Sequence, residues 1–336
     1  MDLLNAIVAL SNFVLVPAVT YGSQLALGAL GVTLIYGILR FSNFAHGDTM
    51  AFGTMVTILV TWGLQALGVG FGPLPTALLA LPFGIAACMA LVLVTDRMVY
   101  RFYRAQKAKP VVFVIVSIGV MFILNGLVRF IIGPGDQRFR DGENFIITAR
   151  DFKDMTGLRE GLALKTTQGI TVVTAVIVVA LLFWFLNRTR TGKSMRAYSD
   201  NEDLALLSGI NPDRVVMVTW LIVAALATVA GTLYGLDKSF KPFTYFQLLL
   251  PVFAAAIVGG LGSPLGAIAG GYVIAFSEVL ITYAWKKVLT YLVPEALEPD
   301  GLVQLLSTNY KFAVSFVILL IVLLFRPTGL FRGKAV

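Results

Sequence analysis

The stretch RTRTGKSMRAYSDNEDLALLSGINPDR, residues 188–214, is a polar and basic island between two long apolar runs. Within it, Ser199 and Glu202 have the spacing of a capping box, in which each side chain satisfies a backbone amide of the first helical turn. Gly209 can end that helix in the left-handed conformation, and Pro212 cannot continue it. The island therefore predicts a separately capped helix of roughly two turns, which is stable in water only when it docks on something.

The predicted helix has an acidic start and an apolar remainder. Asp200, Glu202 and Asp203 place negative charge in its first turn, where the helix dipole favours it. Ala205 is expected on the docking face, because a small residue permits close approach. Two interpretations stay open: the helix packs under its own domain, or it inserts into a soluble partner protein.

The composition is that of an integral membrane protein. Of the 336 residues, 58% are hydrophobic and 13% are charged, whereas soluble domains carry about 25% charged residues. The net charge of +8 is better explained by basic loops that stay in the cytoplasm than by nucleic-acid binding. The single cysteine, Cys88, lies in an apolar run and cannot form a disulfide within the chain.

The apolar runs predict an all-α polytopic membrane protein of about eight to ten transmembrane helices. The whole chain, 1–336, is expected to form one transmembrane domain. Its first run, 3–21, predicts a retained helix that either lies at the membrane interface or crosses the membrane. The later runs are 24–39, 49–65, 78–94, 111–132, 170–186, 215–236, 246–260, 264–284 and 311–325.

The basic residues predict the orientation, because Lys and Arg in short loops are retained in the cytoplasm. We place the loop 187–214 inside, which puts Arg40, the cluster 97–109 and the basic C-terminal end on the same side. The nearly neutral segment 133–168 is then a periplasmic loop, and Asp141-Gly142 predicts a hairpin within it. No Lys or Arg marks the side of the N-terminus.

The segment FSNFAHGDTMAFG, residues 41–53, interrupts two apolar runs with more polar residues than a turn needs. We select Asn43, Phe44, His46 and Gly47 as candidate residues of a translocation pathway. The alternative is that the same residues form a plain cytoplasmic turn, with Asp48 as a helix N-cap. His46 has no second histidine or cysteine cluster with which to build a metal site, so no metal or catalytic role is expected.

The segment VGGLGSPLGAIAGG, residues 258–271, predicts a second helix break, with Gly259, Gly260, Gly262 and Ser263 as candidate pathway residues. Transporters build substrate pathways from such discontinuous helices, but the exposed backbone groups must be covered by protein or water. Gly262 and Gly266, with Gly270, recur at every fourth residue and predict a smooth face for close packing. The discontinuous segments are therefore expected at 41–48 and 259–264.

Glu278 is the clear acidic residue within an apolar run. Intramembrane carboxylates are costly and are candidates for function by default. Two structural roles are equally compatible with its position: the side chain reaches the outer interface, or it pairs with Arg129.

Three stretches resemble the branched-chain amino-acid ABC transporter permease family, and in particular the first inner-membrane permease subunit of the pair. They are RAYSDNEDLALLSGIN at 196–211, NFAHG followed by an acidic residue at 43–48, and GGLGSPLGA at 259–267. The resemblance extends over nearly the whole chain. It implies that the island holds a cytoplasmic coupling helix that contacts an ATPase, through Arg196, Ser199, Asp200, Glu202, Ala205 and Gly209.

The same resemblance implies a translocation subunit of an ATP-driven importer in the bacterial inner membrane, working by alternating access. Its implied partners are a homologous second permease, two ATPase subunits, a periplasmic binding protein and the lipid bilayer. The implied substrate is a branched-chain or other hydrophobic amino acid, with urea, amides and small aromatic acids left open. The C-terminus would be cytoplasmic.

No enzymatic activity and no cofactor are expected in this chain, with ATP and magnesium bound by the partner subunits. The letters NRTRTGKS, residues 187–194, end like a phosphate loop but have Asn187 where its first glycine belongs. An ion-coupled secondary transporter or channel is the main alternative, although it would need more intramembrane polar groups than Glu278. A structural membrane anchor would not need two helix breaks.

Overall fold

The computed structural model describes residues 2–141, 144–293, 301 and 303–331. In these residues, eight continuous helical stretches are long and apolar enough to cross a membrane, and they confirm the all-α polytopic prediction. The stretches are Asp2–Leu39, His46–Ala66, Ala77–Ala105, Pro110–Ile132, Thr166–Arg188, Pro212–Lys238, Pro242–Gly259 and Pro264–Thr282. A shorter apolar helix, α15 (Lys311–Phe325), follows them.

The first two predicted segments form one continuous helix, so the separate first helix at 3–21 was wrong. It comprises α1 (Asp2–Leu10), a π-helical segment η1 (Ser11–Leu15) and α2 (Val16–Leu39). Pro17 cannot donate a backbone hydrogen bond, and the wider π-helical turn before it accommodates this loss without ending the helix. A helix of 38 residues is about 57 Å long, so it extends beyond a bilayer core of about 30 Å.

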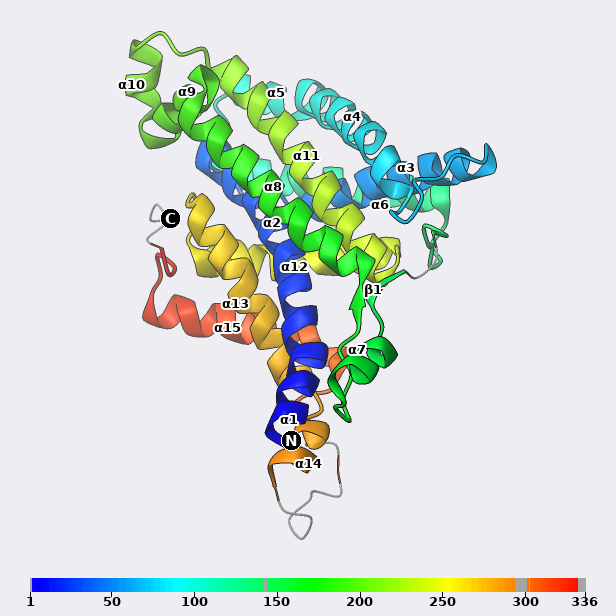
Figure 1. The fold of residues 1–336 in the computed structure, drawn as a ribbon. Coiled ribbons are helices and arrows are strands. Elements are labelled where there is room, and N and C mark those ends of the chain that lie inside the picture. Colours follow the sequence, from blue (N-terminus) through cyan, green and yellow to red (C-terminus); the bar gives the residue numbers. More distant parts are fainter. Residues whose placement is uncertain (1, 142–143, 294–300, 302, 332–336) are drawn as a thin grey trace.

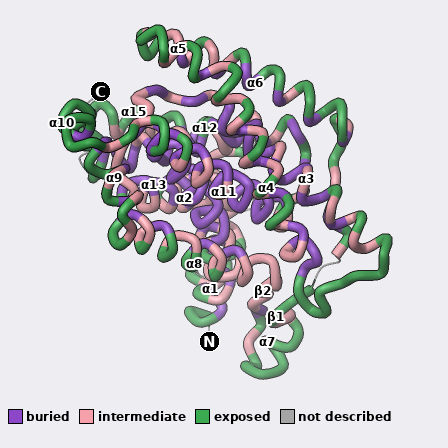
Figure 2. The backbone as a smooth tube through the Cα atoms, turned by 90° about the horizontal axis from the view of Figure 1, so that it is seen from above, coloured by how far each residue is buried: buried purple, intermediate pink, exposed green. Residues whose placement is uncertain are grey.

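Helix α2 is the centre of the molecule. It packs against α8 (Thr166–Arg188), α11 (Pro212–Lys238), α12 (Pro242–Gly259) and α13 (Pro264–Thr282). Figure 2 shows α2, α11, α12 and α13 buried in the middle, with α8 partly exposed and α5, α6, α7 and α10 at the exposed edge. A helix that is apolar all round has no solvent face and belongs in a core.

The helices α3 (His46–Ala66), α4 (Ala77–Thr95) and α6 (Pro110–Ile132) lie to one side of this core (Figure 1). Helix α4 continues through the π-helical segment η2 (Asp96–Tyr100) into α5 (Arg101–Ala105). The basic segment that follows residue 94 is therefore mostly helical, and only a short turn separates it from α6.

The segment 133–168 folds into a small cap at the end of the molecule opposite the island (Figure 1). Its strands β1 (Phe145–Ile147) and β2 (Leu164–Lys165) pair antiparallel around α7 (Ala149–Thr156). The hairpin predicted at Asp141-Gly142 turns on Gly142, while β1 after it pairs with the later strand β2 and Gln137 before it bridges Phe240 of the α11–α12 connection. Gly142 lies outside the described residues.

The cap is tied to the helix α1 and to α14 (Lys286–Leu292). Asn5 Oδ1 accepts hydrogen bonds from the backbone amides of Arg159 and Glu160, at 3.0 and 3.2 Å. Glu160 forms an ion pair with Lys287 at 2.8 Å and accepts a hydrogen bond from Tyr291 at 2.8 Å. These bonds explain why α1 extends past the membrane-length part of its helix. A single 3₁₀ turn, η4 (Thr308–Tyr310), precedes α15.

Candidate functional site

The island consists of two helices, α9 (Arg190–Asp200) and α10 (Glu202–Leu207). The predicted capping box was wrong: Ser199 and Asp200 are the last residues of α9, and the N-cap of α10 is Asn201, whose Oδ1 accepts from Leu204 N at 3.0 Å. The chain turns at Asn201, which has extended backbone, and so its side chain reaches the free amides. Gly209 does adopt positive φ, +78°, as predicted.

Glu202 has a different partner from the one predicted. Its Oε1 accepts a hydrogen bond from the Tyr198 hydroxyl at 2.5 Å, which joins the last turn of α9 to the first residue of α10. Burial, together with the Glu202 carboxylate, raises the pKa of Tyr198 above its ordinary value. The tyrosine therefore stays protonated and remains the hydrogen-bond donor at neutral pH.

The exposed face of α10 differs from the expected one. Ala205 is buried within this chain, with 3% of its surface exposed, whereas Leu204 and Leu207 are 61% and 84% exposed. Residues three apart lie on the same side of a helix. The small alanine therefore lets α10 approach its own chain, and the two leucines form the apolar face available to a partner.

The island meets the C-terminal end of α2 and the second helix break. Arg40 Nη2 donates to the Ser199 carbonyl at 2.6 Å. A cavity of about 190 Å³ lies between α2, α8, α9 and the break. Its lining includes four of the predicted site residues, which are Arg196, Ser199, Asp200 and Gly262. The structure thus brings together two motifs that are about sixty residues apart in the chain.

The first break is a re-entrant turn. The chain leaves α2 at Arg40, which has φ +57°, and α3 begins at His46. His46 is fully buried, and its Nε2 lies 3.0 Å from the carbonyl of Gly28 in the middle of α2. Eleven residues separate Gly28 from Leu39, so α3 starts about 16 Å back along α2 from its end. A plain cytoplasmic turn is therefore wrong.

Buried side chains satisfy the backbone of this turn. Asn43 Oδ1 accepts from Ala45 N at 3.1 Å and from the Tyr100 hydroxyl at 3.2 Å. Ser117 Oγ accepts from Phe44 N at 3.1 Å, and the Phe44 ring packs on Phe253 of α12. These contacts hold the turn against η2, α6 and α12.

Gly47 and Asp48 follow the turn inside α3. A Cβ on Gly47 would lie 2.8 Å from the carbonyl oxygen of Tyr245 in α12, so this glycine allows two helices to pack closely. Asp48 does not cap the helix, because Ala45 holds that position. Its buried carboxylate accepts a hydrogen bond from Asn125 Nδ2 at 2.7 Å.

The second break lies between α12 and α13. Gly260 and Gly262 have φ +112° and +85°, which side chains rarely tolerate, and Ser263 Oγ accepts from Gly266 N to cap α13. Gly262 therefore lies in the break, as predicted, and not on the packing face that its spacing also predicted. Gly266 confirms that face, because a Cβ there would overlap the carbonyl oxygen of Gly259. A Cβ on Gly270 would likewise overlap the carbonyl oxygen of Ala255.

The C-terminal segment 326–331 covers this break. The amides of Leu330 and Phe331 donate to the carbonyls of Val258 and Gly259, at 2.9 and 3.0 Å. A Cβ on Gly329, which has φ +76°, would lie 2.6 Å from Gly260 Cα. Sequence reasoning missed this contact, and its one local signal is the turn-forming sequence Pro327-Thr328-Gly329.

Glu278 is buried, with 2% of its surface exposed, so it does not reach the outer interface. Ser315 Oγ of α15 donates to its Oε1, and Tyr21 of α2 and Lys311 lie within electrostatic range. The predicted pair with Arg129 was also wrong, because Arg129 lies 6.0 Å from the Phe243 ring. The carboxylate therefore joins α2, α13 and α15.

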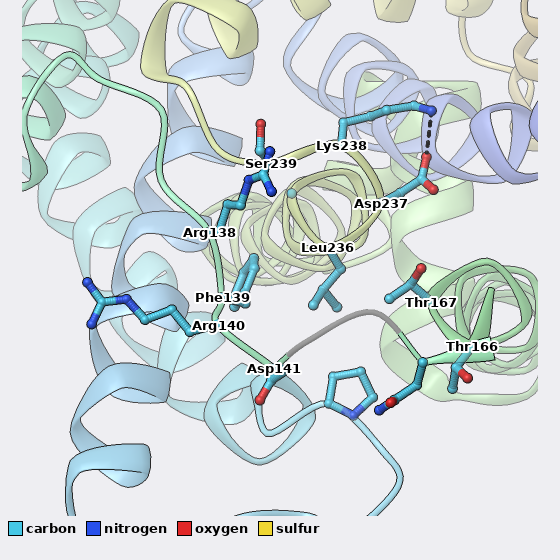
Figure 3. Close-up of a pocket in the computed structure, with 13 residues that line it drawn as sticks. Arg138, Phe139, Arg140, Asp141, Thr166, Thr167, Leu236, Asp237, Lys238 and Ser239 are labelled. Carbon is cyan, nitrogen blue, oxygen red and sulfur yellow. Dashed lines mark ion pairs between the residues drawn. The ribbon is translucent and has the colours of Figure 1, made fainter.

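A cavity of about 320 Å³ lies at the opposite end of α2 from the island. It is bordered by the end of α11, the start of α8 and residues 138–141, and Figure 3 shows Asp141, Thr167 and Leu236 around it. Asp237 and Lys238 form an ion pair at 3.3 Å on its rim. The sequence did not predict this cavity, because its walls come from segments about 100 residues apart.

No group of three His, Cys, Asp or Glu side chains in the described residues could hold a metal ion. Cys88 is buried, and its thiol faces the carbonyl of Thr49 at 3.7 Å.

A buried central helix, two helix breaks beside it and an exposed capped helix at one end define a polytopic membrane transport protein. Residues 14–323 match the family of the branched-chain amino acid transport system permease component, and the chain belongs to that family. It is 31% identical over 318 residues to the high-affinity branched-chain amino acid transport system permease protein LivH of Escherichia coli K12, covering 93% of this chain and 92% of LivH.

Two further relatives have comparable extent. BraD, a high-affinity branched-chain amino acid transport system permease protein of Pseudomonas aeruginosa, is 29% identical over 94% of both chains. The probable branched-chain amino acid transport permease protein LivH of Methanocaldococcus jannaschii is 29% identical over 81% of both chains. The family match over residues 14–323 includes both helix breaks and the island.

Proposed function

We propose that this chain is the translocation subunit of an ATP-driven importer of branched-chain or other hydrophobic amino acids. The main observation is α10, whose Ala205 is buried against its own chain while Leu204 and Leu207 are exposed. A helix of six residues with two exposed leucines is too short to be stable alone. A groove in an ATPase subunit would bury those leucines and receive the helix.

The proposed assembly has three kinds of component besides this chain. A homologous second permease completes the pathway, two ATPase subunits bind ATP and magnesium, and a periplasmic protein delivers the substrate. The location is the bacterial inner membrane, with α9, α10 and the C-terminus in the cytoplasm. Alternating access would open and close the pathway as the island moves. The cavity beside Arg196 and Gly262 supports this, because the island there adjoins a helix break.

The substrate class is proposed from the names of the relatives, which are branched-chain amino acid permeases. Urea, amides and small aromatic acids are the other candidates. Uptake of radiolabelled leucine by the reconstituted complex tests the proposal, with each other class as competitor. Inhibition by valine and isoleucine supports it, while inhibition by urea or benzoate alone contradicts it.

Leu207→Arg tests the coupling role of α10. An arginine at this exposed position does not disturb the fold of the chain, but it places a charge in the proposed apolar groove. We expect loss of substrate-stimulated ATP hydrolysis and of ATPase co-purification. Met155→Arg is the matched control, because Met155 is 83% exposed in the cap at the opposite end. Wild-type coupling in Leu207→Arg would contradict the ATPase contact.

Cysteine labelling tests the orientation. In a Cys88→Ala background, an impermeant reagent added outside should label a cysteine at the exposed Asn144 position and spare one at the exposed Gln106 position. The reverse pattern would place the island outside and contradict the proposal.

An ion-coupled transporter is the second candidate, favoured by the buried Glu278 with Ser315. Uptake that persists without ATP and stops with a protonophore would support it. Glu278→Gln separates the two, since an ATP-driven importer keeps its uptake if the carboxylate serves only to join helices.

A further inference from the structure

A continuous chain of contacts runs from the first helix break to α5 and to α11, and α11 packs against α9 of the island. We call it the Tyr100 cluster and define it as Asn43, Asp96, Tyr100, Arg104 and Trp220. Its members come from the first break, the α4–η2–α5 helix and α11. None of these residues apart from Asn43 was selected from the sequence, because each looks like an ordinary core or loop residue there.

Asp96 is the anchor of the cluster. Arg104 donates to both of its carboxylate oxygens, at 2.6 and 2.9 Å, and Trp220 Nε1 donates to Oδ1 at 2.7 Å. The carboxylate side chain is only 13% exposed. Bidentate, charge-assisted pairs fix orientation as well as distance, so α11 and α5 hold the carboxylate rigidly.

The rings of Trp220 and Tyr100 connect Asp96 to the first break. Trp220 and Tyr100 stack with centroids 5.2 Å apart, and each is 2% exposed. The Tyr100 hydroxyl then donates to Asn43 Oδ1 at 3.2 Å. Asn43 is the residue whose side chain satisfies the backbone of the first break. Because close-packed interiors transmit strain, a shift of Trp220 moves the contact that closes this break.

The outer end of the cluster faces the island. Helix α11, which carries Trp220, packs against α9. The Tyr198 hydroxyl of α9 donates to Glu202, the first residue of α10. Arg40 itself begins the break and donates to the Ser199 carbonyl. The segment that holds Asp96 and Tyr100 is π-helical, a local irregularity found often at functional sites.

We propose, on the basis of the proposed function above, that the Tyr100 cluster transmits movement of the coupling helix to the first helix break. Tyr100 and Trp220 are positioning residues, since they act through Asn43 and Asp96. The first break then opens and closes with the ATPase cycle, while its contacts with α6 and α12 stay in place.

Trp220→Phe tests the link to Asp96, because it keeps a stacking ring and removes one N–H donor. Tyr100→Phe tests the link to Asn43 in the same way. We expect either change to lower substrate-stimulated ATP hydrolysis and the maximal uptake rate about tenfold, by loss of a buried hydrogen bond. Basal hydrolysis, ATPase co-purification and the KM for uptake should stay at wild-type values.

The two variants together sharpen the test. If the residues act in one line, the double variant should be no worse than the more impaired single variant. Trp184→Phe is the matched control, since Trp184 is 60% exposed on α8. A variant that fails to assemble is replaced by Arg104→Lys, which keeps the charge and loses the bidentate geometry.

Wild-type stimulation and uptake in Trp220→Phe and Tyr100→Phe would overturn the inference. So would a simple sum of the two defects, which is expected for two unrelated packing losses. Failure of the proposed function looks different: the wild-type protein would then show neither substrate-stimulated ATP hydrolysis nor ATPase co-purification. If Leu207→Arg uncouples the complex and the cluster variants do not, only the role of the cluster is rejected.

Discussion

The two helix breaks of this protein each use a side-chain cap, but among the described residues only the second, where Ser263 caps α13, is also covered by the backbone of a distant segment. At the first break, side chains of Asn43 and Ser117 accept the hydrogen bonds of the turning backbone. At the second break, backbone amides of the C-terminal segment donate to the carbonyls of Val258 and Gly259. The first closure therefore depends on the chemistry of particular side chains, and the second on the close approach that glycine permits.

This difference separates the mutations to which each break is sensitive. A side-chain closure is broken by removing an acceptor, with little change in shape. A backbone closure is broken by adding atoms, since amide and carbonyl groups are present in every residue. The following changes test that distinction, in decreasing order of the defect that we expect.

Gly266→Leu should cause the most severe defect. Its Cβ would overlap the carbonyl oxygen of Gly259, and the rest of the side chain has no space between α12 and α13. We expect loss of the assembled protein, because overpacking at a single methylene already costs about 1–3 kcal/mol. Yield of folded complex by size-exclusion chromatography measures it. Gly119→Leu is the control, since nothing lies within 4 Å of a Cβ at Gly119, and equal yields would contradict close packing at the second break.

Asn43→Leu should come next, because it keeps the shape and removes the acceptor. Two buried donors, Ala45 N and the Tyr100 hydroxyl, would lose their partner. Each unsatisfied group costs about 1–3 kcal/mol, so the melting temperature of the purified protein should fall clearly. Asn43→Asp retains an acceptor, so its melting temperature should fall less. If Asn43→Leu and Asn43→Asp have the same melting temperature, the side-chain acceptor does not close the first break.

Gly329→Ala should have a moderate and local effect. The residue has φ +76°, and its Cβ would press on Gly260. The left-handed conformation costs an ordinary residue about 1–2 kcal/mol, so the cover over the second break should open more often. Faster hydrogen exchange at Leu330 and Phe331, with unchanged exchange at Ala45, is the expected result. Unchanged exchange at both sites would show that the segment is not held by this glycine.

The mildest effect concerns Glu160, which contacts neither break. Burial opposes its ionisation, but hydrogen bonds from Lys287 and Tyr291 and the Lys287 charge outweigh this and lower its pKa. A lowered pKa means that the stabilisation is complete above the ordinary pKa of 4.5 and is lost as the pH falls through the lowered value. Because Lys287 is 45% exposed, the contribution is about 1 kcal/mol or less.

Hydrogen exchange of the Arg159 and Glu160 amides checks this prediction. Corrected for intrinsic rates, exchange there should increase as the pH falls below 4.5, while amides at both breaks keep their protection. Lys287→Met should remove much of the pH dependence. Equal loss of protection at the cap and at the breaks would mean that acid unfolds the whole protein.

Features that depend on local pattern can be predicted from the amino-acid sequence alone. Apolar runs of membrane length predict the spans, because the bilayer imposes length and composition on each helix separately. Gly260 and Ser263 mark the second break, and Gly209 ends α10, because their conformational preferences are properties of the residue itself.

The partner of each polar group depends instead on the tertiary packing. Asn201 caps α10 in place of Ser199 because the chain turns there, and Ala205 faces inward because α10 packs on its own chain. Glu278 accepts a hydrogen bond from Ser315, and the Leu330 amide donates to the Val258 carbonyl. Both pairs are far apart in the sequence, so no local pattern predicts them. Such choices are set by which helices lie side by side in the folded chain, so the same letters in another packing would find other partners.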